Sequence, residues 1–148
     1  MLLYCAMDEN GLDASSSGPS RGRKPVLVVD DDADIREAVT QVLENDGYPV
    51  AGASNGKEAL EVLHRMPRPG AIVLDLMMPV MDGWQFRAEQ RRDPDLASIP
   101  VIVVSALGRG TQRVAALDAV AYVQKPLMLD PLLDAVSRYC DEESSESK

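Results

Sequence analysis

The sequence predicts an α/β fold in which a parallel sheet of five strands is covered by helices on both faces. Three continuous apolar segments rich in β-branched residues lie at 26–30, 71–75 and 101–105. None of them alternates between apolar and polar residues, which is typical of parallel strands buried on both sides. Weaker segments at 49–53 and 121–125 complete the five strands. Helical patterns lie between them, so strands and helices alternate along the chain.

Residues that start and stop helices support this alternation. Gly47 is placed to end the first helix. Asn55 followed by Glu58 resembles a capping box at the start of the second helix. Asp130 followed by Pro131 predicts an N-cap and a first helical residue for the last helix. The two remaining helices are expected at 84–92 and 111–117.

Composition and charge exclude several classes of function. The formal net charge of −9 argues against nucleic-acid binding, which needs a basic surface. No apolar run approaches the roughly 20 residues of a membrane span. The two cysteines, Cys5 and Cys140, give no disulfide framework and are typical of a reducing, cytoplasmic location. His64 is the single histidine and is expected at the surface, so no Cys/His metal cluster is predicted.

The ordered domain is expected at 25–140. Residues 1–24 are rich in Ser, Gly and charge over most of their length and show no apolar periodicity there, which predicts a disordered leader. Residues 141–148, DEESSESK, predict a short acidic tail.

Polar side chains end the strongest predicted strands. Asp30 and Asp31 follow the first, Asp75 ends the third, Ser105 ends the fourth, and Lys125 follows the fifth. Ligands of open parallel sheets bind at the carboxyl ends of the strands, so these side chains should converge. Three carboxylates in one cleft repel each other unless a cation intervenes, and hard oxygen ligands suit Mg²⁺. The lysine and the hydroxyl can hold phosphoryl oxygens, and a carboxylate can accept a phosphoryl group as nucleophile.

Four strings then resemble one known family, the response-regulator receivers. They are VLVVDDDADIR, IVLDLMMPVMDGW, VIVVSA and YVQKP, and they span essentially all of 25–140. The resemblance implies a flavodoxin-like (βα)5 doubly wound sheet in the order 2-1-3-4-5. It also implies a switch in two-component phosphorelay signalling that catalyses only its own phosphorylation and dephosphorylation. Its phosphoryl donor would be a sensor histidine kinase or a histidine phosphotransfer protein.

The resemblance also assigns the metal site. By this likeness Asp75 is the phospho-acceptor, and it binds Mg²⁺ together with Asp30 and Asp31, directly or through water. The backbone carbonyl of Met77 is a further ligand of the ion in the family pattern.

The switch residues follow from the same likeness. Ser105 donates its hydroxyl to the phosphoryl group and moves with it, and Lys125 pairs with that group. The bond between Lys125 and Pro126 is typically cis in the family. Tyr122 matches the aromatic position whose rotamer reports activation, and the face formed by the fourth helix, the fifth strand and the fifth helix is then read by partner proteins.

Some of these residues also have a simpler interpretation. Asp32 and Asp34 are expected only to favour the start of a helix through its dipole. Asp82 before Gly83 indicates a turn and helix entry. The alternative for Tyr122 is a half-buried packing residue. Packing is also expected for five apolar residues that follow the phospho-acceptor: Met77, Met78, Met81, Trp84 and Phe86. If the methionines among them are exposed, they would make an adaptable surface for a partner.

Two features depart from the family pattern. Met77 and Leu107 are apolar where many receivers place polar side chains that position the water which hydrolyses the acyl phosphate. Slow autodephosphorylation is therefore predicted. The stretch from Ser105 to Lys125 is slightly shorter than in well-studied receivers and lacks the usual Gly-Ala turn, so a short fourth helix is expected.

Three classes of function compete. A signalling switch is favoured, with output by binding a separate protein or by onward phosphotransfer, because no room is expected for an effector domain after Tyr139. A phosphorylation-independent receiver-like module is the alternative, and the intact set of polar strand endings argues against it. A small-substrate aspartyl-phosphate hydrolase would carry a second aspartate where Met77 stands. The P-loop pattern GxxxxGK[ST] does not follow the first strand.

Overall fold

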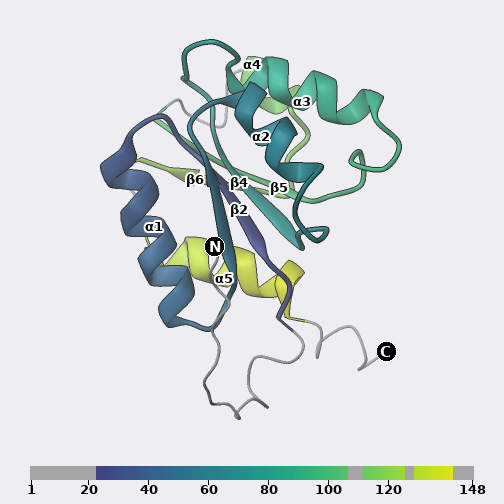
Figure 1. Cartoon of the computed structure of the whole chain (residues 1–148). Coiled ribbons are helices and arrows are strands. Elements are labelled where there is room, and N and C mark those ends of the chain that lie inside the picture. The colour runs from purple at the N-terminus through teal and green to yellow at the C-terminus, as the bar shows by residue number, and fades with distance from the viewer. Residues whose placement is uncertain (1–22, 107–111, 126–128, 142–148) are drawn as a thin grey trace.

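The computed structural model of this chain describes residues 23–106, 112–125 and 129–141 (Figure 1). Strands and helices alternate along these residues, as predicted. The strands are β2 (Val26–Val29), β3 (Val50–Ala53), β4 (Ala71–Asp75), β5 (Val101–Ser105) and β6 (Ala121–Gln124), and the helices are α1 (Ala33–Asn45), α2 (Gly56–Leu63), α3 (Gly83–Arg92), α4 (Gln112–Ala115) and α5 (Leu129–Cys140). In the part of the chain that the structure describes, no helix is long and apolar enough to cross a membrane.

All neighbouring strands pair in parallel, in the order β3-β2-β4-β5-β6. Counted along the chain this is the order 2-1-3-4-5, so the expected flavodoxin-like topology is confirmed. The chain first adds β3 on one side of β2 and then crosses to add β4 on the other. The carboxyl ends of β2 and β4 therefore lie side by side at the point where the order reverses, which is where ligands bind in open α/β sheets.

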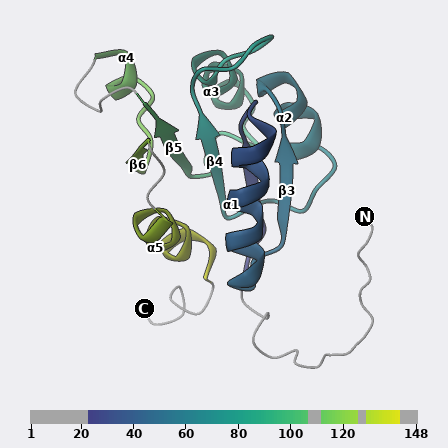
Figure 2. The same ribbon diagram turned by 90° about the vertical axis from the view of Figure 1, so that its left-hand side faces the viewer.

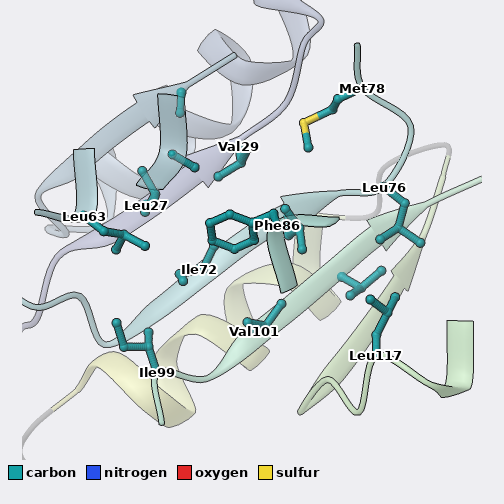
Figure 3. Close-up of a cluster of buried hydrophobic side chains, with 14 of the residues drawn as sticks. Leu27, Val29, Leu63, Ile72, Leu76, Met78, Phe86, Ile99, Val101 and Leu117 are labelled. Atoms are coloured by element: carbon teal, nitrogen blue, oxygen red, sulfur yellow. The ribbon is translucent and has the colours of Figure 1, made fainter. Parts of the chain in front are cut away.

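Two apolar clusters cover the two faces of the sheet. In β2, Leu27 and Val29 belong to the cluster that holds residues of α2 and α3, while Val26 and Val28 belong to the cluster that holds residues of α1 and α5. Figures 1 and 2 show these two pairs of helices on opposite sides of the sheet. Because helices bury both faces, every residue of the strand is apolar, and the pattern does not alternate. Figure 3 shows the Phe86 ring of α3 inside the first cluster.

Several predicted helix ends are confirmed. The Asp32 carboxylate accepts hydrogen bonds from the backbone N–H groups of Asp34 and Ile35 and caps α1. Gly47 follows this helix with a φ of 98°, a left-handed conformation that glycine adopts without strain. Asp82 caps α3 in a complete capping box with Gln85.

The start of α2 differs in detail from the prediction. Asn55 does cap the helix and accepts a hydrogen bond from the backbone N–H of Glu58 at 2.8 Å. The Glu58 carboxylate, however, accepts from the hydroxyl and the backbone N–H of Ser54, both at 2.7 Å. In a capping box this carboxylate would instead accept from the backbone N–H of the N-cap residue, Asn55.

The predicted start of the last helix is wrong by two residues, because Pro131 was expected as its first residue. α5 begins at Leu129, so Asp130 and Pro131 are its second and third residues. Proline is tolerated there because the first N–H groups of a helix have no helical acceptor. Asp130 in this first turn still interacts favourably with the helix dipole. The expected short fourth helix is found, since α4 has four residues.

Candidate functional site

Three carboxylates meet where β2 and β4 end. Asp30 and Asp31 follow β2, and Asp75 is the last residue of β4. Each offers an oxygen atom within 4.8 Å of the others. Asp30 and Asp75 are 4% and 5% exposed, whereas Asp31 is exposed to solvent. The acidic residues predicted from the strand endings are therefore brought together, and one of them keeps access to water.

The junction between β2 and α1 fixes the orientation of Asp30. Its Oδ1 accepts a hydrogen bond from the backbone N–H of Asp32 at 2.9 Å, and its backbone carbonyl accepts from the Arg36 guanidinium at 2.6 Å. Asp32 in turn caps α1. Arg36 was not singled out from the sequence, although its position one helical turn after the cap lets it reach back to the strand end.

Lys125 lies against the buried pair of carboxylates. Its Nζ is 3.4 Å from Oδ1 of Asp75 and 3.6 Å from Oδ2 of Asp30. The backbone N–H of Lys125 donates to the carbonyl of Ser105 at 2.9 Å, which extends the pairing of β5 and β6 up to the site. Ser105, at the end of β5, is itself buried. The five polar residues expected at this edge thus lie at the ends of adjacent strands.

Electrostatics at the site favour a bound cation. Burial raises the pKa of Asp75 above its ordinary range, the neighbouring Asp30 carboxylate raises it further, and Lys125 opposes both effects. One ammonium group therefore compensates only part of the negative charge of three carboxylates. Hard, closely spaced carboxylate oxygens with one solvent-exposed member are the donor set that Mg²⁺ takes in proteins. The residues present fit this ion.

The loop after Asp75 presents apolar side chains to solvent. Met77 is 62% exposed and Val80 is 74% exposed. The prediction that the methionines of this loop all pack is therefore wrong for Met77, whereas Met78 is buried. Val80 has a φ of 70°, and the N–H of Met81 donates to the carbonyl of Pro79 at 2.7 Å, which closes a γ-turn.

Tyr122 is half-buried and packs against the cluster on the α2 and α3 side of the sheet. Its hydroxyl donates to the carbonyl of Val114 and accepts from the N–H of Ala119, both at 3.3 Å. Both interpretations offered by the sequence, a switch and a packing residue, place an aromatic ring in such surroundings. Leu107 and Pro126 lie outside the described residues.

The fold and the site define a flavodoxin-like α/β domain with an acidic centre at the carboxyl edge of its sheet. Residues 26–137 match the response regulator receiver domain. The chain belongs to the response regulator receiver family. Receivers are signalling modules of two-component systems, not classical enzymes, and they bind Mg²⁺ at an acidic site.

Similar proteins are found by sequence and by structure. The response regulator MprA of Mycolicibacterium vanbaalenii is 42% identical over 110 residues, which are 73% of this chain and 46% of that protein. The chain spans about half the length of the curated relatives it matches. A receiver protein from Pseudomonas putida has a TM-score of 0.72 and 34% identity, covering 78% of this chain and 97% of its own. The CheX–CheY–BeF3–Mg²⁺ complex from Borrelia burgdorferi contributes a chain with a TM-score of 0.70 and 26% identity, covering 80% of this chain and 96% of its own.

Proposed function

We propose that this chain is a Mg²⁺-dependent phosphorelay switch that accepts a phosphoryl group on Asp75. The observation that carries the proposal is the convergence of Asp30, Asp31, Asp75 and Lys125 at the switch point of a receiver fold. The donor is the phosphohistidine of a sensor histidine kinase or of a histidine phosphotransfer protein. The output is contact with a separate protein or onward phosphotransfer.

The buried position of Asp75 suits it to act as the nucleophile. A carboxylate oxygen forms the new bond to phosphorus while the nitrogen–phosphorus bond of the donor breaks, and its electron pair stays with the leaving imidazole. Asp30, Asp31, Asp75 and the carbonyl of Met77 would hold Mg²⁺, which when bound neutralises charge on the phosphoryl oxygens. Lys125, already 3.4 Å from Asp75, pairs with the same oxygens.

The switch itself would use Ser105 and Tyr122. Both lie on adjacent strands, β5 and β6, whose register pairs Val103 with Tyr122. A phosphoryl group on Asp75 adds negative charge and acceptor oxygens, to which the Ser105 hydroxyl can donate. A shift of Ser105 changes the space available to Tyr122, and the equilibrium between two arrangements of β6 and the neighbouring helices moves.

The structure of a related complex supports a protein partner for the output. The CheY chain from Borrelia burgdorferi was solved with CheX, BeF3 and Mg²⁺. For this chain too, output by contact with a separate protein is proposed.

The exposed Met77 side chain supports slow autodephosphorylation. An apolar group beside Asp75 offers no hydrogen bond to an attacking water. Met77→Asn should therefore hasten the decay of the phosphorylated protein by about fivefold, as a single hydrogen bond of about 1 kcal/mol allows. The matched control is Met77→Leu, which keeps an apolar side chain and should decay like the parent. Equal decay rates in all three proteins would contradict the role given to this position.

The proposed function is tested by incubating the purified protein with acetyl phosphate and Mg²⁺ and following its intact mass. The parent should gain one phosphoryl group, EDTA should prevent the gain, and Asp75→Asn should show none. Asp82→Asn is the matched control, because asparagine also caps a helix and Asp82 lies outside the acidic cluster. A folded parent that gains no mass from acetyl phosphate or from any histidine kinase supplied would favour the phosphorylation-independent interaction module.

A further inference from the structure

Side chains of α3 hold the turn that connects α4 to β6. We call this segment, residues 116–120, the α4–β6 turn. The Arg87 guanidinium donates to the carbonyl of Leu117 at 2.8 Å through Nε and to the carbonyl of Asp118 at 3.1 Å. Arg91, one helical turn later, also donates to the carbonyl of Leu117 at 2.8 Å. Two guanidinium groups of α3 are thus committed to backbone carbonyls of one short turn.

Arg87 is rigidly placed for this contact. Only 9% of the residue is exposed, and its third hydrogen bond goes to the side-chain carbonyl of Gln90 at 2.9 Å. Gln90 is fully buried and donates to the carbonyls of Leu96 and Ile99. A planar guanidinium with neutral acceptors in fixed directions specifies geometry strongly. Its burial is costly for a charged group, as the lowered pKa of Arg87 also indicates.

The turn contains a residue in the left-handed backbone conformation. Asp118 has a φ of 53°, a region that aspartate tolerates better than most non-glycine residues, and its carbonyl accepts one of the hydrogen bonds from Arg87. The side chain of Leu117 is buried in the same cluster as Phe86, the residue that precedes Arg87, as Figure 3 shows. The core therefore holds the side chain of Leu117, and the arginines of α3 hold the carbonyls of the turn.

The same segment meets the proposed switch residue. The N–H of Ala119 donates to the Tyr122 hydroxyl, which donates to the carbonyl of Val114. The other end of α3 lies against the phospho-acceptor: the N–H of Gly83 donates to the carbonyl of Leu76 at 2.9 Å, and a Cβ added at Gly83 would be 3.0 Å from the carbonyl oxygen of Asp75. One helix thus contacts both the acceptor strand and the α4–β6 turn.

We propose that Arg87 is a positioning residue for the Asp75 switch. Through the carbonyls of Leu117 and Asp118 it keeps the α4–β6 turn, and with it the Tyr122 hydroxyl, in the arrangement described above, which we assign to the unphosphorylated protein. The inference rests on the proposed function, because phosphorylation of Asp75 would have to weaken the hydrogen bonds from Arg87 to the turn. Hydrogen bonds made in one arrangement raise the free-energy cost of leaving it. If the phosphoryl group is accepted only in the other arrangement, the rate of phosphorylation is proportional to the population of that arrangement, so weakening these bonds should raise the rate.

The test compares Arg87→Met with Arg92→Met. Both changes remove a guanidinium from α3, but Arg92 is exposed, and within the described part of the chain it pairs with Glu89 on the surface. In the unphosphorylated protein, the amide hydrogen of Ala119 should exchange about tenfold faster in Arg87→Met than in the parent and at the parental rate in Arg92→Met. With acetyl phosphate and Mg²⁺, the initial rate of mass gain should rise about three- to tenfold in Arg87→Met and stay unchanged in Arg92→Met.

The rise in rate separates a positioning role from a structural one, since mere loss of stability does not accelerate phosphorylation. Faster exchange with an unchanged or slower rate of phosphorylation would overturn the proposal. If Arg87→Met does not fold, Arg87→Lys replaces it, because lysine keeps the charge but cannot reach both carbonyls as a fork. A parent that gains no phosphoryl group overturns the proposed function as well, whereas a phosphorylated parent with an unchanged variant overturns this inference alone.

Discussion

Asp75→Asn should stabilise the metal-free protein. At an effective dielectric constant of about 20, the Asp30 carboxylate within 4.8 Å repels Asp75 by about 3.5 kcal/mol, and Lys125 at 3.4 Å attracts it by about 5 kcal/mol. The attraction exceeds the repulsion by about 1.5 kcal/mol, so the two interactions cancel only in part. The remaining contribution is the desolvation of a buried carboxylate, which costs several kcal/mol and which asparagine avoids. We therefore expect the variant to be more stable by about 1–3 kcal/mol, in agreement with the raised pKa of Asp75.

Mg²⁺ should reverse this order. An ion that binds only the folded protein stabilises it by about 2.7 kcal/mol when its concentration is about one hundred times its dissociation constant. The parent should gain this stability, because it offers three carboxylates. The Asp75→Asn variant keeps two of them and should gain much less.

The measurement is thermal unfolding of both proteins with EDTA and with saturating Mg²⁺. At roughly 4 °C per kcal/mol for a domain of this size, the expected differences are several degrees. Asp82→Asn, outside the cluster, should respond to Mg²⁺ as the parent does. A parent that is the more stable protein in EDTA, or a variant that gains as much from Mg²⁺ as the parent, would refute the electrostatic reasoning.

Further expectations concern strain, burial and pH. Val80→Gly should stabilise the protein by about 1 kcal/mol, since relief of about 1–3 kcal/mol of strain at a φ of 70° exceeds the entropic cost of glycine; denaturant unfolding that shows a loss contradicts this. Tyr48→Phe should destabilise it by about 1 kcal/mol in the same assay, because the buried ring loses the hydrogen bond of its hydroxyl to Asp141 at 2.8 Å. Hydrogen bonds from Ser54 lower the pKa of Glu58, so the stability they contribute is present above pH 4.5 and is lost as the pH falls through the lower folded-state pKa. The stability gap to Glu58→Gln should close over that range, and a gap that stays constant would exclude this linkage.

The strands and the acidic edge of the sheet could be predicted because they depend on local patterns. A parallel sheet buried on both faces requires continuous apolar strands, and the first polar residue after each strand must then lie at one edge. Asp30, Asp31, Asp75, Ser105 and Lys125 were identified on this basis, and the structure places them at the ends of adjacent strands.

Contacts between distant segments could not be predicted in the same way. The acceptors of Arg87 on the α4–β6 turn lie 30 and 31 residues further along the chain, and arginine side chains are mostly exposed. The loop that exposes Met77 also contains a γ-turn at Val80, a conformation that β-branched residues rarely adopt. Neither feature leaves a periodic signal in the sequence.

The central claim is that Asp75 carries the phosphoryl group, and the most direct measurement locates that group on the chain. The protein is incubated with acetyl phosphate and Mg²⁺, the acyl phosphate is reduced with borohydride to the alcohol, and the resulting homoserine is located by peptide mass spectrometry. Homoserine at position 75 is expected, with none in a sample treated with EDTA. Homoserine at Asp30, Asp31 or another carboxylate, with Asp75 unchanged, would contradict the assignment of the acceptor.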